Sequence, residues 1–258
     1  MEAETKIPIN YQYPLSAAIY KILATASPEY AGWLHTKGYL TSNSKPMKLF
    51  VFSRLIIEKP ERLFNVLIIR NHSTCTLYIS SPMLYDFVEN FVTGLFEQTT
   101  IEIGNPQTVG RFRVTGVETF PEPQFKSPVS CRCLSPIVFS TMHEHKGKMH
   151  QYYLRPDDGR LSELIRNNLI RKHEIAYGNV PDNTDLTVIP DTDYINRRGG
   201  IEKVSKLITI KEWQGEKSVK VKSFIVPFEM HGSEQMIRTA YECGIGEKNS
   251  IGFGMIEI

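Results

Sequence analysis

The sequence predicts an α+β protein in which two similar units follow each other along the chain. Residues 129–258 show the order β-α-β-β-α-β with one additional hairpin strand. Residues 14–119 show α-β-β-α-β, without an obvious opening strand. Between them lies PEPQFKSP (121–128), whose prolines favour a linker. Two tandem ferredoxin-like domains are the simplest interpretation of this order.

The first unit opens with two predicted helices. Apolar residues recur at helical spacing over 14–25: Leu15, Ala18, Ile19, Ile22 and Leu23. A second helix begins at Ser27-Pro28-Glu29, because serine is a good N-cap, proline suits the first turn and an acid suits the helix start. We expect it to end near Gly38.

Strands and one helix complete the first unit, 1–122. Runs of β-branched and aromatic residues predict strands at 48–57, 63–70, 74–80, 99–103 and 109–119. Ser81-Pro82 predicts the start of an amphipathic helix before the fourth of these strands. Its apolar face includes Leu84, Phe87 and Leu95.

The second unit, 129–258, repeats this alternation. The predicted elements are a strand at 129–140, a helix from Leu161 to near Gly178, strands at 186–189, 205–213 and 218–229, a helix at 233–243 and a strand at 253–258. Lys172 is on the first of these helices, where it faces either the cleft between the domains or solvent.

The composition indicates a globular protein without a membrane-spanning segment. The chain has 258 residues, with 41% hydrophobic and 22% charged residues, as in soluble globular proteins. No run approaches the roughly 20 apolar residues that span a bilayer, and MEAETKIPIN does not resemble a signal peptide. We therefore expect a cytoplasmic protein without a membrane partner. Four scattered cysteines favour buried thiols: Cys75, Cys131, Cys133 and Cys243.

A basic run and a histidine-rich stretch are weak indications of binding sites. Between Tyr194 and Lys222 there are eight Lys or Arg against three Glu, including Arg197 and Arg198. This run fits a solvated hairpin and a polyanion surface equally well. Three histidines in MHEHKGKMH (142–150) invite a metal site, but no suitable carboxylate or cysteine completes one, so we expect no metal.

The segment GIGEKNSIGFG (244–254) is the most distinctive motif. It lacks the spacing of a Walker loop or a dinucleotide fingerprint, and it follows a helix and precedes a strand, the reverse of their order. Gly244 is expected to cap the preceding helix in the left-handed region. Gly252 and Gly254 mark a strand entrance where a backbone or a ligand approaches closely. Either a structural turn or a nucleic-acid binding loop fits.

Several segments resemble one family. YECGIGEKNSIGFGMIEI (241–258) is similar to the C-terminal signature of the CRISPR repeat-RNA processing endoribonucleases of the RAMP superfamily. The family's opening helices and following strand are similar to three segments of this chain: NYQYPLSAAIY, SPEYAGWLH and KLFVFSRL. LSPIVFS (134–140) and AYG (176–178) also have counterparts, in the expected order.

The resemblance implies tandem ferredoxin-like (RRM-like) domains that face each other across a cleft. It implies metal-independent cleavage of CRISPR repeat RNA (pre-crRNA), in which the ribose 2′-OH attacks the adjacent phosphate and leaves 2′,3′-cyclic phosphate and 5′-OH ends. No cofactor is implied. The resemblance also matches the family's catalytic Tyr, His and Lys to Tyr20, His35 and Lys48. RNA contacts are expected at the glycine-rich loop and the basic run: Gly244, Gly246, Lys248, Gly252, Gly254, Arg197 and Arg198.

The chemistry of the three catalytic candidates is compatible with this reaction, which needs a base, an acid and a cation. His35 lies in the last turn of its helix, where the helix dipole favours imidazolium. Each candidate also has a structural interpretation. Tyr20 suits packing at the edge of an apolar stripe, His35 suits a helix end, and Lys48 suits a solvated strand end. Lys37 and Lys45 are close enough to take the place of Lys48.

One departure from the family concerns the opening strand, since only MEAETKI precedes Pro8. Either that strand is very short, or the chain as given starts late.

Three functions remain open at this point. The first is a repeat-RNA endoribonuclease, and the second is a non-catalytic crRNA-binding subunit of the same superfamily. The third is a structural or metabolite-binding pair of domains. A CRISPR interference complex and a homodimer are compatible partners.

Overall fold

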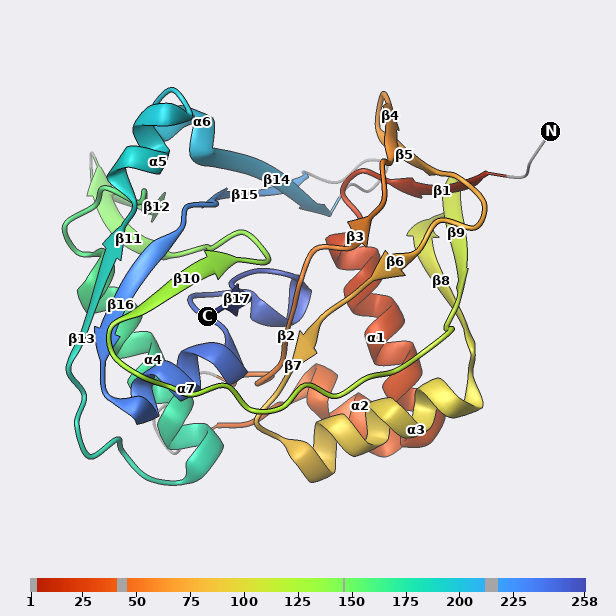
Figure 1. The fold of residues 1–258 in the computed structure, drawn as a ribbon, viewed down its shortest axis with the longest axis horizontal. Coiled ribbons are helices and arrows are strands. Elements are labelled where there is room, and N and C mark those ends of the chain that lie inside the picture. The colour runs from red at the N-terminus through yellow and green to blue at the C-terminus, as the bar shows by residue number, and fades with distance from the viewer. Residues whose placement is uncertain (1–3, 41–45, 146, 212–217) are drawn as a thin grey trace.

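The computed structural model describes residues 4–40, 46–145, 147–211 and 218–258. It has two lobes side by side, one built from β1 to β9 and the other from β10 to β17 (Figure 1). Each lobe has its own apolar core. Phe50, Phe52 and Leu23 lie in the first core, and Ile165, Leu169 and Met230 in the second. The predicted α+β fold of two ferredoxin-like domains is confirmed.

The first domain begins with a short strand. β1 (Thr5–Pro8) pairs antiparallel with β5, with Ile7 opposite Leu67. A short opening strand is therefore present. The remaining elements are α1 (Gln12–Ala26), α2 (Pro28–Thr36), β2 (Val51–Phe52), β3 (Ile56–Ile57), β4 (Glu61–Leu63), β5 (Val66–Ile69), β6 (Cys75–Thr76), β7 (Ile79–Ser80), η1 (Leu84–Val88), α3 (Glu89–Glu97), β8 (Thr100–Asn105) and β9 (Thr108–Arg113).

Three predicted strands of this domain are broken, and the one expected at 74–80 divides into β6 and β7. The strand expected at 48–57 is reduced to β2 and β3, and Leu49, before β2, has φ 46°, which no regular strand accepts. The strand expected at 63–70 is the hairpin β4–β5, which turns at Phe64 with φ 50°. Apolar runs alone did not reveal these turns, because neither contains glycine or proline.

The second domain has the strand order of a ferredoxin-like fold. Its sheet runs β13-β16-β10-β17, and all neighbours are antiparallel. The elements are β10 (Val129–Cys133), β11 (Ser140–His145), β12 (Lys148–Tyr153), α4 (Leu161–Tyr177), β13 (Leu186–Pro190), α5 (Thr192–Arg197), α6 (Ile201–Val204), β14 (Ser205–Lys211), β15 (Val219–Phe224), β16 (Phe228–Gly232), α7 (Glu234–Cys243), η2 (Asn249–Ile251) and β17 (Ile256–Glu257).

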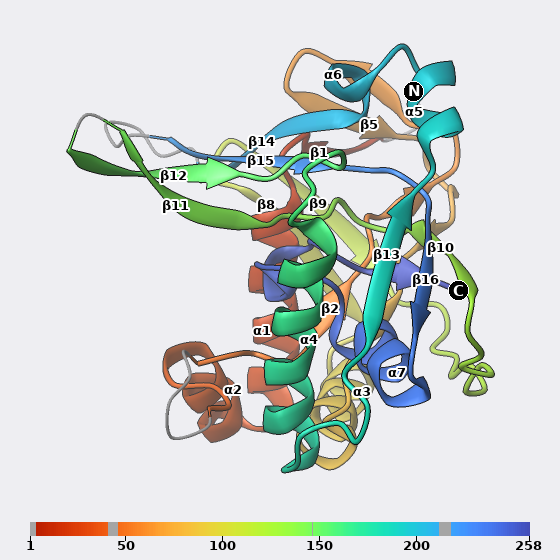
Figure 2. The ribbon, with the colours of Figure 1, turned by 90° about the vertical axis from the view of Figure 1, so that its left-hand side faces the viewer.

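Insertions in this domain depart from the predicted order. The histidine-rich stretch forms the hairpin β11–β12, which was not predicted. The helices α5 and α6 were not predicted, and the strand expected at 218–229 divides at Pro227 into β15 and β16. β11–β12 and β14–β15 project together from the domain (Figure 2), where the Tyr153 hydroxyl donates to the Lys220 carbonyl at 3.4 Å.

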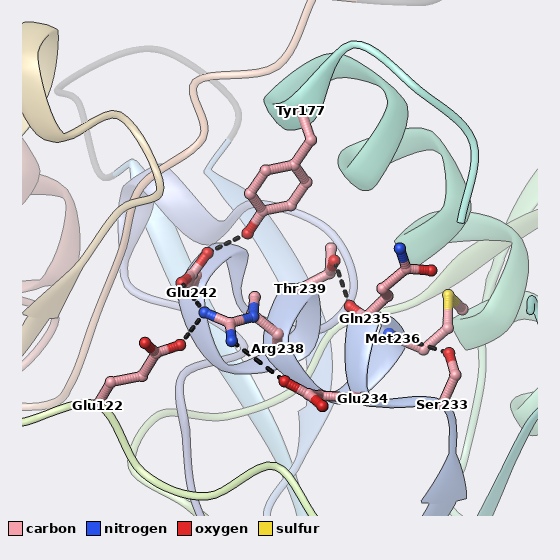
Figure 3. A network of polar contacts seen from close by, with 9 residues as sticks. All are labelled: Glu122, Tyr177, Ser233, Glu234, Gln235, Met236, Arg238, Thr239 and Glu242. Atoms are coloured by element: carbon pink, nitrogen blue, oxygen red, sulfur yellow. Dashed lines mark hydrogen bonds and ion pairs between the residues drawn. The ribbon is translucent and has the colours of Figure 1, made fainter. Parts of the chain in front are cut away.

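The linker between the domains is held against α7. The Arg238 guanidinium contacts the Glu122 carboxylate, lies 3.3 Å from that of Glu234, and lies 4.7 Å from the centre of the Phe125 ring. The Tyr177 hydroxyl donates to Glu242 in the same network (Figure 3). These contacts fix the path of the chain between the domains. Among the helices that the structure describes, none has the length and apolarity needed to cross a membrane.

Candidate active site

Tyr20 and His35 meet where α1 packs on α2. Their ring centroids lie 5.3 Å apart, with planes inclined at 85°. Ser27 positions the second helix, because its hydroxyl accepts a hydrogen bond from the Tyr30 N–H as the predicted N-cap. His35 then falls in the last turn of α2 and is exposed, whereas Tyr20 is half-buried and also packs on Phe50.

Lys48 joins this pair from the chain segment before β2. Its Nζ donates to the carbonyl of Leu34 and, at 2.8 Å, to the carbonyl of His35. These carbonyls belong to the C-terminal end of α2, where a cation is favourable. The bridge between Tyr39 and Met47 brings this segment back to the helix end. The structure thus brings together all three predicted catalytic residues.

A glycine makes this approach of Lys48 sterically accessible. Gly38 has φ 72°, and a Cβ there would lie 2.7 Å from the Met47 carbonyl oxygen and 3.2 Å from Lys48 Nζ. A larger residue at 38 would therefore push Lys48 away from α2. Of the alternative lysines, Lys37 is exposed at the C-cap of α2, and Lys45 lies outside the described residues.

The surroundings shift the proton affinities of two of these groups. Burial raises the pKa of the Tyr20 phenol well above its usual range, and the nearby Tyr30 adds to this effect. Burial lowers the pKa of the Lys48 ammonium. Tyr20 is therefore a neutral phenol near pH 7, which donates a hydrogen bond but accepts a proton poorly.

The glycines of the loop 244–254 are packed against the protein's own chain. A Cβ at Gly246 would lie 2.4 Å from the Val138 carbonyl oxygen, and one at Gly254 would lie 1.9 Å from that of Ile245. All four predicted glycines are buried with positive φ. Their requirement for glycine is thus explained by packing, and RNA contact at them stays a prediction.

One prediction about this loop needs correction. Gly244 does follow the last residue of α7, but its φ of 73° is combined with ψ of 165°. That conformation lies outside the left-handed helical region and is open almost only to glycine. A Cβ added to Gly244 would lie 2.7 Å from Val51 Cγ2. The chain therefore leaves α7 in an extended path that packs against the first domain.

The loop reaches the helix that carries Tyr20. The Ser16 hydroxyl donates to the Ser250 carbonyl at 2.7 Å, and Ser16 lies on α1 one turn before Tyr20. A Cβ on Gly252 would lie 2.8 Å from Phe52 Cε2. The fold therefore places the loop, distant in sequence, beside the predicted catalytic helix.

The charged candidates for RNA contact occupy two separate places. Lys248 is half-buried at the start of η2, with a positive φ of 62°. Arg197 ends α5, where it lies 3.9 Å from the Asp191 carboxylate, and Arg198 lies over the Tyr194 ring at 5.3 Å. Figures 1 and 2 both place α5 at the opposite end of the molecule from α2. RNA contact at these three residues stays a prediction.

Lys172 is buried, in contrast to the cleft-facing or solvent-facing position expected for it. Its side chain is 4% exposed and lies under the glycine-rich loop, facing neither the cleft nor solvent. The helical spacing contained this information, because Lys172 continues the buried stripe of Leu161, Ile165 and Leu169.

A cavity of about 540 Å³ opens at the outer end of the second domain, between the start of α4, β13 and α5. Its lining includes Asp157, Val188 and Asn196 and none of the predicted site residues. The predicted catalytic residues therefore lie outside this cavity.

Two known protein families together match nearly the whole chain. The family described as "CRISPR-associated protein Cas6, N-terminal" matches residues 6–114, and the family described as "CRISPR associated protein Cas6, C-terminal" matches residues 120–258. A relative from Methanocaldococcus jannaschii, named CRISPR-associated endoribonuclease Cas6 1, is 32% identical over 98% of this chain and 87% of its own length. A relative from Pyrococcus furiosus, named CRISPR-associated endoribonuclease Cas6, is 24% identical over 98% of this chain and 84% of its own.

Solved structures share the fold. One titled "CRISPR associated protein Cas6" has a TM-score of 0.71 at 30% identity, covering 98% of this chain and 97% of its own. One titled "Characterization of a Cas6-related gene from Pyrococcus furiosus" has a TM-score of 0.77 at 22% identity, covering 100% and 98%.

Proposed function

This chain belongs to the Cas6 family of CRISPR-associated proteins and is an endoribonuclease, and we propose that it cleaves CRISPR repeat RNA by attack of a ribose 2′-OH on the adjacent phosphate. The observation that carries the mechanism is the convergence of Tyr20 from α1, His35 from α2 and Lys48 from the segment before β2. The products are a 2′,3′-cyclic phosphate and a 5′-OH. The same chemistry needs no metal ion, because His35 supplies its base and its acid, Lys48 supplies its cation, and Tyr20 donates an orienting hydrogen bond.

His35 is the proton-transfer group in this proposal. Imidazole titrates closest to neutral pH of all side chains, and His35 is exposed, so substrate can approach it. In its neutral form His35 takes the proton of the attacking 2′-OH, and the imidazolium that results gives this proton to the 5′ oxygen as that oxygen leaves. Tyr20 packs edge-on against His35 and, as a neutral phenol, donates a hydrogen bond that orients the reacting ribose or phosphate.

Lys48 stabilises the charge that develops on the phosphate. An ammonium has three N–H donors, and in the described part of the chain Lys48 gives two of them to the Leu34 and His35 carbonyls. The third remains for a phosphate oxygen. Because the same two bonds hold the backbone of His35, Lys48 also fixes the distance between the cation and the imidazole.

The test is cleavage of the CRISPR repeat RNA encoded beside the gene, with and without EDTA, followed by analysis of the product ends. We expect one cut per repeat, a 2′,3′-cyclic phosphate, and no effect of EDTA. A 3′-OH product or loss of activity in EDTA would contradict the mechanism. Tight binding without cleavage would instead support a non-catalytic crRNA-binding subunit.

A further inference from the structure

Lys172 is a charged side chain in the interior of the second domain. It lies on α4 between that helix and the glycine-rich loop, at 4% exposure. A buried ammonium is costly unless its hydrogen bonds are satisfied. The proposed chemistry does not use Lys172, so this cost calls for another explanation.

The loop supplies the missing partners. Lys172 Nζ donates to the carbonyls of Gly244 at 2.6 Å and Gly246 at 3.0 Å, and to Asn249 Oδ1 at 2.8 Å. Three acceptors match the three donors of an ammonium, and a neutral amine would leave one of them unsatisfied. Both glycines have positive φ, so the turning of their carbonyls toward Lys172 depends on glycine.

Further hydrogen bonds connect the same loop with the first domain. Asn249 Nδ2 donates to the carbonyls of Ile245 at 3.1 Å and Phe253 at 2.9 Å, which closes the loop on itself. The next residue, Ser250, accepts the hydrogen bond from Ser16. A continuous series of bonds therefore connects Lys172 with α1.

We propose that Lys172 is a positioning residue for the proposed cleavage reaction: its buried ammonium fixes the glycine-rich loop, and the loop fixes α1, which carries Tyr20. The effect on cleavage rests on the proposed function, whereas the effect on the loop does not. Lys248, whose backbone is also held in this loop, is positioned by the same bonds.

The test replaces the ammonium with an uncharged chain of similar length, Lys172→Met. In the RNA-free protein at pH 6, where Lys172 is protonated, we expect backbone amides of 245–254 to exchange hydrogen at least about tenfold faster, since even one charge-assisted hydrogen bond is worth that factor. At saturating repeat RNA we expect the single-turnover rate constant to fall about 10- to 100-fold, as for misplaced catalytic groups. The affinity of Lys172→Met for an RNA with a 2′-deoxy cleavage site should change by a smaller factor than this rate constant.

Arg171→Met is the matched control. Arg171 neighbours Lys172 on α4 but is exposed, and its hydrogen bond among the described residues stays within its own helix, to the Asn167 carbonyl at 3.3 Å. This variant removes the same charge and should leave loop exchange and cleavage unchanged.

A double-mutant cycle tests transmission through α1. If Lys172 acts through the Ser16 contact, Ser16→Ala and Lys172→Met should have rate effects that do not add. Loop exchange in Lys172→Met equal to that of the wild type would overturn the proposal, even if wild-type protein failed to cleave RNA. Faster exchange with an unchanged saturating rate would reduce Lys172 to a purely structural residue.

Discussion

Ser16 and Ser250 are 234 positions apart in sequence, and the hydroxyl of the first donates to the carbonyl of the second at 2.7 Å. Ser16 is 3% exposed, so the bond is shielded from water. It lies one helical turn from Tyr20, on the same face of α1. The contact therefore links the C-terminal loop of one domain to the proposed catalytic helix of the other.

His35→Ala should abolish cleavage and preserve RNA binding. His35 is exposed, so its loss leaves the core intact, whereas the loss of a general acid or base costs about 10²- to 10⁴-fold in rate. Single-turnover cleavage and equilibrium binding measure the two effects separately. His72→Asn is the control, because His72 is exposed in a turn with φ 64°, which asparagine adopts readily. Comparable cleavage by His35→Ala and wild type would exclude His35 from the reaction.

Tyr20→Phe should slow cleavage with little change in stability. The ring packs on His35 and Phe50, and phenylalanine retains both contacts. Only the hydroxyl is lost, which the proposal assigns to orienting the substrate. We expect the saturating rate constant to fall at least about tenfold, the value of one hydrogen bond made in the transition state. Unchanged rates would make Tyr20 a packing residue.

The N-cap at Ser27 and the helix end near Gly178 were predicted correctly, whereas the left-handed cap expected at Gly244 was not found. Ser27 and Ser233 are N-caps whose hydroxyls accept from the N–H three residues later, and Gly178 caps α4 in the left-handed conformation. These features are local, so the residues themselves specify them. The proximity of Tyr20, His35 and Lys48 was expected only from the family resemblance. It depends on Gly38 and on the Tyr39–Met47 bridge, which periodicity does not reveal.

The glycine-rich loop shows what sequence pattern alone omits. Its glycines were assigned to a turn or to close approach of RNA, and the structure gives them contacts with their own chain, such as Val138 and Phe52. Those contacts come from distant segments, which a single sequence does not pair. Lys172 was missed for a related reason. A lysine on a helix is normally solvated, and its acceptors are carbonyls whose direction depends on the tertiary fold.

Lys48→Met should impair both stability and cleavage. The variant loses the hydrogen bonds to the carbonyls of Leu34 and His35, which should lower the free energy of unfolding by about 1 kcal/mol. Cleavage should fall by a much larger factor, because the cation that meets the phosphate is also lost. Urea denaturation and single-turnover kinetics separate these effects. Lys21→Met, at an exposed lysine of α1, serves as the control. A loss of rate no greater than the loss of folded protein would count against a catalytic Lys48.

The contribution of Lys172 to stability should depend on pH. Burial lowers its pKa to about 7, opposed by the Cys243 thiol and the Glu247 carboxylate and reinforced by Arg171. In the unfolded chain the ordinary pKa is 10.5. Between these values the unfolded state binds a proton that the folded state lacks, so this group makes stability rise with pH. The unfolding free energy of wild type minus that of Lys172→Met should therefore increase from pH 7 to 10. A difference that stays constant would show that the loop carbonyls keep Lys172 charged throughout.

Gly254→Ala and Gly32→Ala should change stability in opposite directions. At Gly254 a Cβ would lie 1.9 Å from the Ile245 carbonyl oxygen, and φ is 79°, so the loop must distort. We expect a loss of more than about 2 kcal/mol of unfolding free energy. At Gly32, inside α2, no described atom beyond the adjacent residues and the backbone of its own helix lies within 4 Å of the new Cβ, and alanine should add about 0.5–1 kcal/mol because it is the better helix former. Denaturant unfolding measures both. If Gly254→Ala were as stable as wild type, the loop would not be the tightly packed element described, and its glycines would regain a role in contacting RNA.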